Sequence, residues 1–332
     1  MESREIRLKA RPAGLPGPEH FELATVTVPP PGPGEVRVRN RFLSVDPYMR
    51  GRMIDRPSYV PPFSLGAPLE GGALGEVVDS GDPAFRPGDL VLSMLGWREA
   101  FTAPASALRR VEPIPGIPEQ AFLGVLGMPG LTAWGGLLQI GQPRPGETVF
   151  VSGAAGAVGS AVAQIARNLG CTVVASAGSE AKCAWLRTVG IPHVINYRTC
   201  GNLLEAVRAA APQGIDVYFD NVGGEHLEVA LACARPFGRL VECGMISQYN
   251  AEVPPPGPRN LVLVIAKSLR MQGFIVTQFG PLEAEFRAQM AAWIREGRLQ
   301  WQETVVEGIA NAPEAFIGLF RGDNLGKMLV RT

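Results

Sequence analysis

Strand-like and helix-like stretches alternate through the middle of this chain. The apolar run 148–151 is followed by apolar residues at the spacing of one helix face, namely Val158, Val162, Ile165 and Leu169. The pattern repeats. It predicts strands at 148–152, 172–176, 193–196, 216–220, 238–243 and 269–276, and helices at 157–169, 180–189, 202–211, 224–234 and 283–296. Regular alternation of this kind is typical of a doubly wound parallel sheet.

The two ends of the chain follow a different pattern, in which short strands are separated by glycine and proline. Residues 35–43 alternate like a half-buried strand, and 71–78 and 89–93 resemble further strands. The end of the chain returns to strand-like segments such as 327–331, which we expect to join the first domain. Because 332 residues are too many for one ordinary core, we predict an α/β protein with a Rossmann-type parallel sheet and a second, β-rich, barrel-like domain.

A glycine-rich turn joins the first strand of the predicted parallel sheet to its helix. It reads Ser-Gly-Ala-Ala-Gly-Ala-Val-Gly-Ser over 152–160, so that Gly153, Gly156 and Gly159 are evenly spaced. Such glycines let the backbone turn sharply, let a pyrophosphate approach the helix N-terminus and let the helix pack closely on the strand. The turn therefore predicts dinucleotide binding. The alternative is a tight turn without a ligand.

The end of the second predicted strand indicates which dinucleotide is bound. Folds that select NAD place an acidic residue there to hold the ribose 2′-hydroxyl, but here Gly178 follows the strand. Lys182 lies four residues later, and Tyr197 and Arg198 follow the third strand. A cation with hydroxyl donors suits a phosphate dianion, so we predict NADP(H). Lys182 would otherwise be an exposed helix lysine, and nearby Glu180 speaks against a phosphate site unless it points outward.

Charge and apolar patterning restrict the class of protein. Lys and Arg number 31, as do Asp and Glu, so the basic face that nucleic-acid binding requires is not expected. No apolar run reaches the length of a membrane span, and residues 1–5 do not begin a secretory signal. We therefore expect a cytoplasmic protein without a nucleic-acid or membrane partner.

The cysteines and histidines argue against a metal site. Five scattered cysteines lie at 171, 183, 200, 233 and 243, and the three histidines, at 20, 193 and 226, are not paired at the spacing of metal ligands. This usage is typical of reduced thiols in a cytosolic chain. We expect chemistry without zinc, which needs clustered ligands.

Several further strings occur in an order that resembles a known family. They are Ser-Val-Asp-Pro-Tyr-Met-Arg at 44–50, Gly-Met-Pro-Gly-Leu-Thr-Ala-Trp at 127–134, Asp-Asn-Val-Gly-Gly at 220–224, Cys-Gly-Met-Ile-Ser-Gln-Tyr-Asn at 243–250 and Gly-Asp-Asn-Leu-Gly-Lys at 322–327. With the glycine turn, they resemble the zinc-independent medium-chain dehydrogenase/reductase superfamily. More narrowly, they resemble its group of leukotriene B4 12-hydroxydehydrogenases, 15-oxoprostaglandin 13-reductases, alkenal double-bond reductases and curcumin reductases.

The resemblance implies a domain organisation. A GroES-like catalytic domain would comprise 1–122 and 299–332, around a Rossmann NADP-binding domain at 123–298, with the cofactor in the cleft. It also implies a homodimer through the last strand of the Rossmann sheet, at 269–276. Together with the glycine turn, the expected cofactor-binding residues are Met128, Thr132, Gly153, Ala154, Gly156, Ala157, Val158, Gly178, Lys182, Tyr197, Asn221, Cys243, Gly244, Met245 and Asn324. Met128 and Cys243 also fit a place in the core.

The implied activity is NADPH-dependent reduction of the C=C bond of α,β-unsaturated aldehydes and ketones. Hydride would pass to the β-carbon, and the enolate would then be protonated. Without a metal, the donors to the enolate oxygen must be hydroxyl groups, main-chain N–H groups or the ribose of the cofactor. The candidates are Tyr48 first, then Tyr249 and Tyr59, although Tyr48 could be a packed aromatic after Pro47. A tyrosine that some members carry after the sixth strand is absent from 273–279.

The expected substrate is a small apolar enone or enal. The side chains offered to its pocket are Phe63, Trp97, Phe101, Met245 and Phe279. Two alternatives remain at this stage: a quinone reductase of the same superfamily, and a non-enzymatic NADPH-binding sensor or scaffold. The proline-rich segment 254–258 is the one feature that hints at a protein partner.

Overall fold

A computed structural model describes residues 1–332, which fold into two compact units. The terminal unit contains Met1–Leu123, Glu303–Asn324 and Met328–Thr332, and the central unit contains Gly124–Gln302 and Leu325–Lys327. The chain thus changes unit at 123/124 and 302/303, whereas the sequence suggested 122/123 and 298/299. The short return of Leu325–Lys327 to the central unit was not expected.

The central unit is built on a six-stranded parallel sheet with the order β10-β9-β8-β11-β12-β13. Its strands are β8 (Thr148–Val151), β9 (Thr172–Ala177), β10 (His193–Asn196), β11 (Ile215–Asp220), β12 (Ala234–Glu242) and β13 (Arg270–Gly273). Starting from β8, the chain builds outward to β10 and then returns to build β11 to β13 on the other side. This is the doubly wound order of a Rossmann fold.

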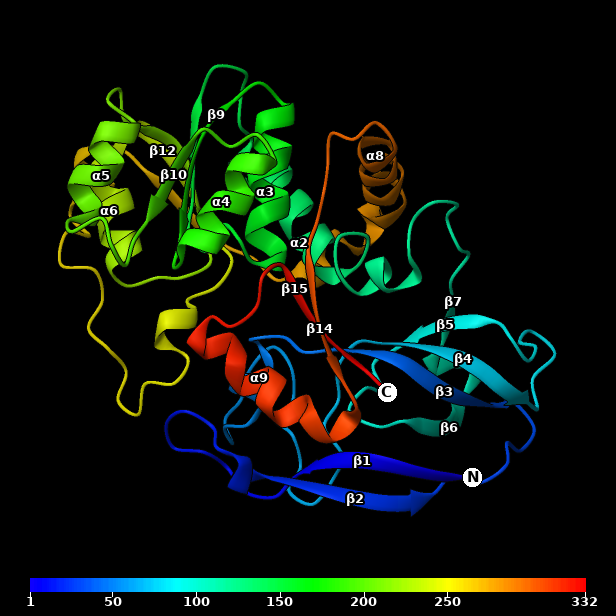
Figure 1. The fold of residues 1–332 in the computed structure, drawn as a ribbon. Helices are drawn as coiled ribbons and strands as arrows, with labels where there is room; N and C mark the ends of the chain where they lie inside the picture. Colours follow the sequence, from blue (N-terminus) through cyan, green and yellow to red (C-terminus); the bar gives the residue numbers. More distant parts are fainter. The chain divides into compact units, whose positions relative to one another are not determined.

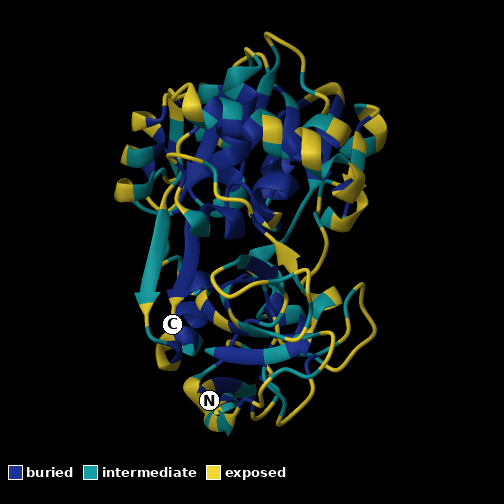
Figure 2. Cartoon of the chain, turned by 90° about the vertical axis from the view of Figure 1, so that its right-hand side faces the viewer, coloured by how far each residue is buried: buried dark blue, intermediate teal, exposed yellow.

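Helices cover both faces of this sheet. They are α2 (Met128–Gly135), α3 (Ala157–Asn168), α4 (Glu180–Thr188), α5 (Leu203–Ala210), α6 (Glu225–Cys233), α7 (Leu263–Ala266) and α8 (Glu283–Arg295). Figure 1 shows α5 and α6 side by side. Their apolar residues, such as Val207 and Leu231, form one buried cluster with Phe150 and Tyr218 of the sheet. Figure 2 shows the strands of this sheet buried and the outer turns of its helices exposed, as amphipathic helices require.

The terminal unit is built mainly from antiparallel strands. β1 (Glu2–Leu8) pairs with β2 (Phe21–Thr27), and a seven-stranded sheet has the order β14-β15-β3-β4-β5-β7, with β6 against β3. The strands of the larger sheet are β3 (Glu35–Ser44), β4 (Ala73–Ser80), β5 (Leu90–Ser93), β6 (Ala100–Pro104), β7 (Arg109–Arg110), β14 (Glu303–Glu307) and β15 (Lys327–Arg331). The predicted fold class, a Rossmann sheet with a separate β-rich domain, is confirmed.

Two elements show where the structure departs from the sequence prediction. The final segment contains a ten-residue helix, α9 (Ala312–Arg321), where only strands were expected. Its Phe316 is fully buried and packs edge-on against Trp97, so tertiary packing stabilises this helix. The last parallel strand, expected at 269–276, covers only Arg270–Gly273, because its neighbour β12 ends at Glu242, the partner of Gly273.

The remaining helical segments are short. They are α1 (Met49–Arg52), the 3-10 turns Pro18–His20, Ala105–Ala107, Glu119–Leu123, Ile246–Gln248, Val276–Leu282 and Ile309–Asn311, and a π-helical segment at Gly136–Gly141. None of the helices has the length and apolar character needed to cross a bilayer.

Candidate functional site

The carboxyl ends of four neighbouring strands in the central unit carry the motifs that the sequence singled out. The glycine turn follows β8, Gly178 follows β9, Asn221 follows β11, and Cys243 follows β12. Because these strands are parallel and adjacent, their carboxyl ends meet at one edge of the sheet. Ligands of doubly wound sheets bind at this edge.

The glycine turn leaves the N-terminus of α3 open to a ligand. Gly153 has φ +58°, which favours glycine, and a Cβ at Gly159 would lie 2.4 Å from the Gly153 carbonyl oxygen. Gly156 is the N-cap residue and offers no side-chain hydrogen bond to the first turn, Ala157–Gly159. The N–H groups of that turn remain donors for an anion, and the helix dipole favours negative charge there.

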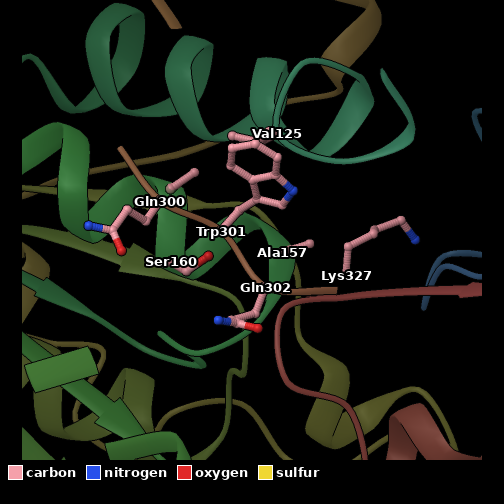
Figure 3. Close-up of a pocket in the computed structure, with 8 residues that line it drawn as sticks. Val125, Ala157, Ser160, Gln300, Trp301, Gln302 and Lys327 are labelled. Carbon is pink, nitrogen blue, oxygen red and sulfur yellow. The ribbon is translucent and has the colours of Figure 1, made fainter. Parts of the chain in front are cut away.

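The last residues of the Gly-Asp-Asn-Leu-Gly-Lys motif, 326 and 327, lie against the glycine turn. The Gly326 N–H donates to the Ala155 carbonyl at 2.9 Å, and Lys327 N–H donates to Gln302 at 2.9 Å. A cavity of about 10 Å³ lies beside them, which is room for about one water. Figure 3 shows side chains that line it, among them Trp301, Ser160 and Lys327. The cavity is too small for a dinucleotide, and residues 300–302 and Lys327 pack closely against α3 around it.

The end of β9 has the chemistry of a phosphate site. Tyr197 directly follows β10, its N–H donates to the Ala177 carbonyl at 3.1 Å, and its hydroxyl lies over Gly178. Ser179 caps α4 by accepting from the Lys182 N–H, so that Lys182 is in the first turn beside Gly178. Glu180 accepts a hydrogen bond from the Asn196 side chain at 2.6 Å. Its carboxylate is therefore bound to the end of β10.

Asn221 joins the first and fourth strands. Its N–H donates to the Ser152 hydroxyl at 2.9 Å, and its side-chain amide donates to the Ser152 carbonyl at 2.8 Å. Ser152 is fully buried and was not among the predicted site residues. The pair fixes the start of the glycine turn against the Asp-Asn-Val-Gly-Gly turn, and it leaves the amide oxygen of Asn221 as an acceptor at the site.

The turn after β12 brings Cys243, Gly244 and Met245 to the same edge. The N–H groups of Cys243 and Gly244 both donate to the Asp220 carbonyl at 3.0 Å, and Met245 N–H donates to the Tyr249 hydroxyl at 3.3 Å. Burial raises the pKa of the Cys243 thiol to about 12, with a further contribution from the charge of Asp220. The thiol therefore stays protonated and is not a nucleophile.

Met128 begins α2, and Thr132 lies one turn later on the same face of the helix. The Thr132 hydroxyl donates to the Met128 carbonyl at 2.7 Å, which orients a buried hydroxyl on this helix. Met128 itself is partly exposed, so the alternative of a core position does not hold for its side chain.

The other predicted site residues belong to the terminal unit. Tyr48 precedes α1 and is half-buried against the core of that unit, and burial followed by the charge of Asp46 raises its pKa, so its hydroxyl stays protonated. Tyr59 is 63% exposed, and Asn324 lies just before the chain returns to the central unit. Arg50 is buried and donates to the carbonyls of residues 12–14, a structural role.

The apolar side chains proposed for a substrate pocket lie mostly in cores, and that expectation is corrected. Phe63 and Trp97 belong to the main core of the terminal unit, and Phe101 belongs to its second core. Phe279 is buried against Gly135, where a Cβ would lie 2.2 Å from its ring. Composition alone does not separate a core aromatic from a pocket aromatic. Met245 differs, because it lines a cavity of about 130 Å³ with Gln248 and residues 255–258.

Known proteins resemble this chain over nearly its whole length. Residues 4–111 match the family described as N-terminal domain of oxidoreductase, and residues 157–296 match the family described as zinc-binding dehydrogenase. NADPH-dependent curcumin reductase of Escherichia coli (strain K12) is 42% identical over 335 residues, which cover 99% of this chain and 96% of that protein. The NADP(+)-dependent 2-alkenal reductase of Nicotiana tabacum is 41% identical over 334 residues, covering 99% and 97%.

A solved structure agrees with these relatives. The crystal structure of CurA in complex with NADPH, from Vibrio vulnificus, matches with a TM-score of 0.94 and 40% identity, and the match covers 99% of each chain. One matched family is described as zinc-binding, yet this structure contains no group of three or more His, Cys, Asp and Glu side chains placed to hold a metal ion.

Proposed function

The chain belongs to the alkenal and prostaglandin reductase group of the medium-chain dehydrogenase/reductase superfamily, and on that premise we propose that it reduces the C=C bond of α,β-unsaturated aldehydes and ketones with NADPH. It is an NADP-dependent oxidoreductase. The finer assignment, to small apolar enones and enals, is supported by the buried, protonated thiol of Cys243 at the carboxyl edge of the central sheet and by the buried hydroxyl of Thr132 on α2.

One observation carries the choice of cofactor: the Tyr197 hydroxyl lies over Gly178 at the end of β9, Lys182 is in the first turn of the helix that follows, and Glu180 is bound to Asn196. The absence of a side chain at Gly178 leaves the Tyr197 hydroxyl facing the strand end, and Lys182 adds a positive charge. A ribose 2′-phosphate needs a cation and hydroxyl donors in this place. The N-terminus of α3 would hold the pyrophosphate, and Asn221 with the turn 243–245 would hold the nicotinamide half.

The protein's own contribution to the reaction is binding, orientation and proton handling. When bound, NADPH supplies the hydride. Orientation of the double bond over the cofactor lowers the entropic part of the barrier. Negative charge then develops on the carbonyl oxygen, where a neutral hydroxyl donor stabilises it. Because its pKa is raised by burial, Tyr48 stays a donor across the physiological range, and it is our first candidate. Tyr249 is second, since its hydroxyl accepts from the Met245 N–H and so lies at the turn after β12.

The test is NADPH consumption by the purified protein with a substrate panel. The panel contains a 2-alkenal, an aryl enone, a quinone and a saturated ketone, with NADH in parallel and products identified by mass spectrometry. The proposal expects a gain of two hydrogens at the alkene, with NADPH strongly preferred. Turnover of the quinone alone would identify a quinone reductase instead. NADPH binding without any turnover would indicate a sensor or scaffold.

We also propose a cytoplasmic homodimer that pairs through β13. This strand is the edge of the parallel sheet, and the segment that leads into it carries exposed apolar side chains: Val262 is 68% and Ile265 81% exposed. Phe237, 74% exposed, is linked to this segment through its N–H bond to the Lys267 carbonyl. An unpaired edge with apolar neighbours invites association. Sedimentation of wild-type protein as a dimer, and of Ile265→Glu as a monomer, would support this; a wild-type monomer at micromolar concentration would refute it.

A further inference from the structure

Two carboxyl groups face each other beneath the candidate cofactor site. Asp220 is the last residue of β11 and Glu242 is the last residue of β12, and the register of the two parallel strands pairs them directly. Asp220 is fully buried, and both carboxyl oxygens of Glu242 are shielded from solvent. If both carboxyl groups were ionised, the two buried negative charges would repel each other strongly.

The hydrogen bonds of the pair are unequally distributed. Oδ1 of Asp220 accepts from the Tyr218 hydroxyl at 2.7 Å, from the Ser152 hydroxyl at 3.0 Å and from the N–H groups of Val222 and Gly223, both at 2.8 Å. Oδ2 of Asp220 and both oxygens of Glu242 are buried without any donor. Three neighbouring acceptors without a donor are an unusual arrangement in a folded protein.

No neighbouring group neutralises the pair. The titratable side chains that face it are Tyr218 on β11, Cys243 after β12 and His226 on α6. On the two flanking strands, β13 presents Gly273 opposite Glu242, and Ser152 directly follows β8. Burial raises the pKa of Tyr218 well above its usual value and that of Cys243 to about 12, and it lowers the pKa of His226 to about 4. All three are therefore neutral at physiological pH.

We propose that Glu242 is the neutral acid in the working protein, that it donates its carboxyl proton to Oδ2 of Asp220, and that this acid–carboxylate pair is a positioning element for the cofactor-binding turns 221–224 and 243–245. One proton gives Oδ2 its missing donor and removes one of the two charges. Burial, followed by the charge of Asp220, raises the pKa of Glu242 to about 8, which agrees with this assignment.

The pair acts on the site through Asp220. Its Oδ1 holds the N–H groups of Val222 and Gly223, and its main-chain carbonyl holds those of Cys243 and Gly244. The two turns touch, since a Cβ at Gly223 would lie 2.8 Å from the Cβ of Met245. Loss of the shared proton would push the ends of β11 and β12 apart and add a negative charge under an anionic cofactor. Both effects weaken binding. This consequence rests on the proposed function, whereas the protonation of Glu242 does not.

Infrared spectroscopy of the protein alone tests the protonation. The infrared difference spectrum of wild type minus Glu242→Gln should contain the C=O stretch of a protonated carboxyl group near neutral pH. This band should disappear above about pH 8. A difference spectrum that lacks the band near neutral pH overturns the proposal. Glu205→Gln, on an exposed residue of α5 that is paired with Arg208, is the control and should leave the band in place.

Equilibrium binding of NADPH from about pH 7 to about pH 10 tests the positioning role. The wild-type dissociation constant should rise about tenfold per pH unit above the pKa of Glu242, as for one required proton. Glu242→Gln, whose amide donates to Oδ2 but does not titrate, should bind with a flat profile up to about pH 9. Glu242→Leu leaves Oδ2 without a donor and should bind more weakly at every pH, with the same flat profile.

The two claims can fail separately. If the NADPH dissociation constant of Glu242→Gln rises above about pH 8 as that of wild type does, the positioning role is wrong. If NADPH fails to bind wild type at any pH, the proposed function is wrong, and the infrared band still decides whether Glu242 holds the proton.

Discussion

The Tyr197 hydroxyl lies over Gly178, and a Cβ atom at residue 178 would sit 2.6 Å from that oxygen. The two residues come from different strand ends, since Gly178 follows β9 and Tyr197 follows β10. The Tyr197 ring makes an edge-to-face contact with His226, with ring centroids 5.1 Å apart. Glycine is therefore required at 178 for the tyrosine to keep its place, and this contact sets the chemistry of the strand end.

Gly178→Ala should weaken NADPH binding about tenfold or more, because the displaced hydroxyl loses a hydrogen bond to a charged phosphate, worth about 1.5–3 kcal/mol. Titration calorimetry with NADPH and NADH measures this, and the NADH affinity should change much less. Gly280→Ala is the matched control, since a Cβ there meets nothing within 4 Å. Equal loss for both cofactors would contradict the role given to Tyr197.

Lys182→Ala should reverse much of the preference for NADPH over NADH, since the charge that complements a 2′-phosphate is removed. We expect kcat/KM with NADPH to fall by about tenfold to a hundredfold, with little change for NADH. Arg187→Ala removes an exposed cation from the last turn of the same helix and should leave both values unchanged. A similar preference in Lys182→Ala and wild type would show that Lys182 is only a surface lysine.

Tyr48→Phe should lower kcat by about a hundredfold and leave the affinity for NADPH unchanged, because it removes a donor for the enolate oxygen. Presteady-state consumption of NADPH with an aryl enone would measure the chemical step. Tyr59→Phe and Tyr249→Phe are compared under the same conditions. The largest loss identifies the donor, and a loss confined to Tyr249→Phe would move the role to that residue.

Gly326→Ala should strongly destabilise the protein. A Cβ at this position would lie 1.9 Å from the Gln302 carbonyl oxygen, and the residue has φ +69°. We expect the free energy of unfolding to fall by about 3 kcal/mol or more, measured by urea denaturation. Gly146→Ala has a similar φ of +85° in open space and should cost only about 1 kcal/mol. Equal costs would mean that backbone strain, and not the clash, is responsible.

Stability at acid pH should depend on Glu147. Burial of its carboxyl group acts to raise the pKa, but hydrogen bonds from the Arg239 guanidinium and the Arg144 N–H outweigh burial, and the pKa is lowered. A carboxyl whose folded pKa lies below its unfolded pKa adds stability above the unfolded value, and that stability is lost as pH falls through the folded one. Glu147→Gln should lower the free energy of unfolding by about 2 kcal/mol near neutral pH. It should also reduce the fall in melting temperature that wild type shows as the pH becomes acidic. A fall identical to that of wild type would refute this.

The sequence determined the regular elements of the central unit. Apolar periodicity placed β8 to β12 and α3 to α6 within a few residues, and the glycine turn indicated the strand-to-helix junction, because these signals depend on neighbouring residues. The absence of a carboxylate after β9 indicated NADP(H) for the same reason. Local signals failed for α9, whose helix is stabilised by packing of Phe316 against Trp97, more than 200 residues away in the chain.

Tertiary structure alone decided which side chains meet. Phe101 and Phe279 are apolar in the same way that a pocket residue would be, and only their burial assigns them to cores. Glu242 ends β12 directly after the buried residues Leu240 and Val241, a signal the sequence contained, but its partner Asp220 is chosen by the register of two parallel strands. Register is set by long-range packing across the whole sheet, so no local pattern could have shown that the two carboxyl groups share one buried place.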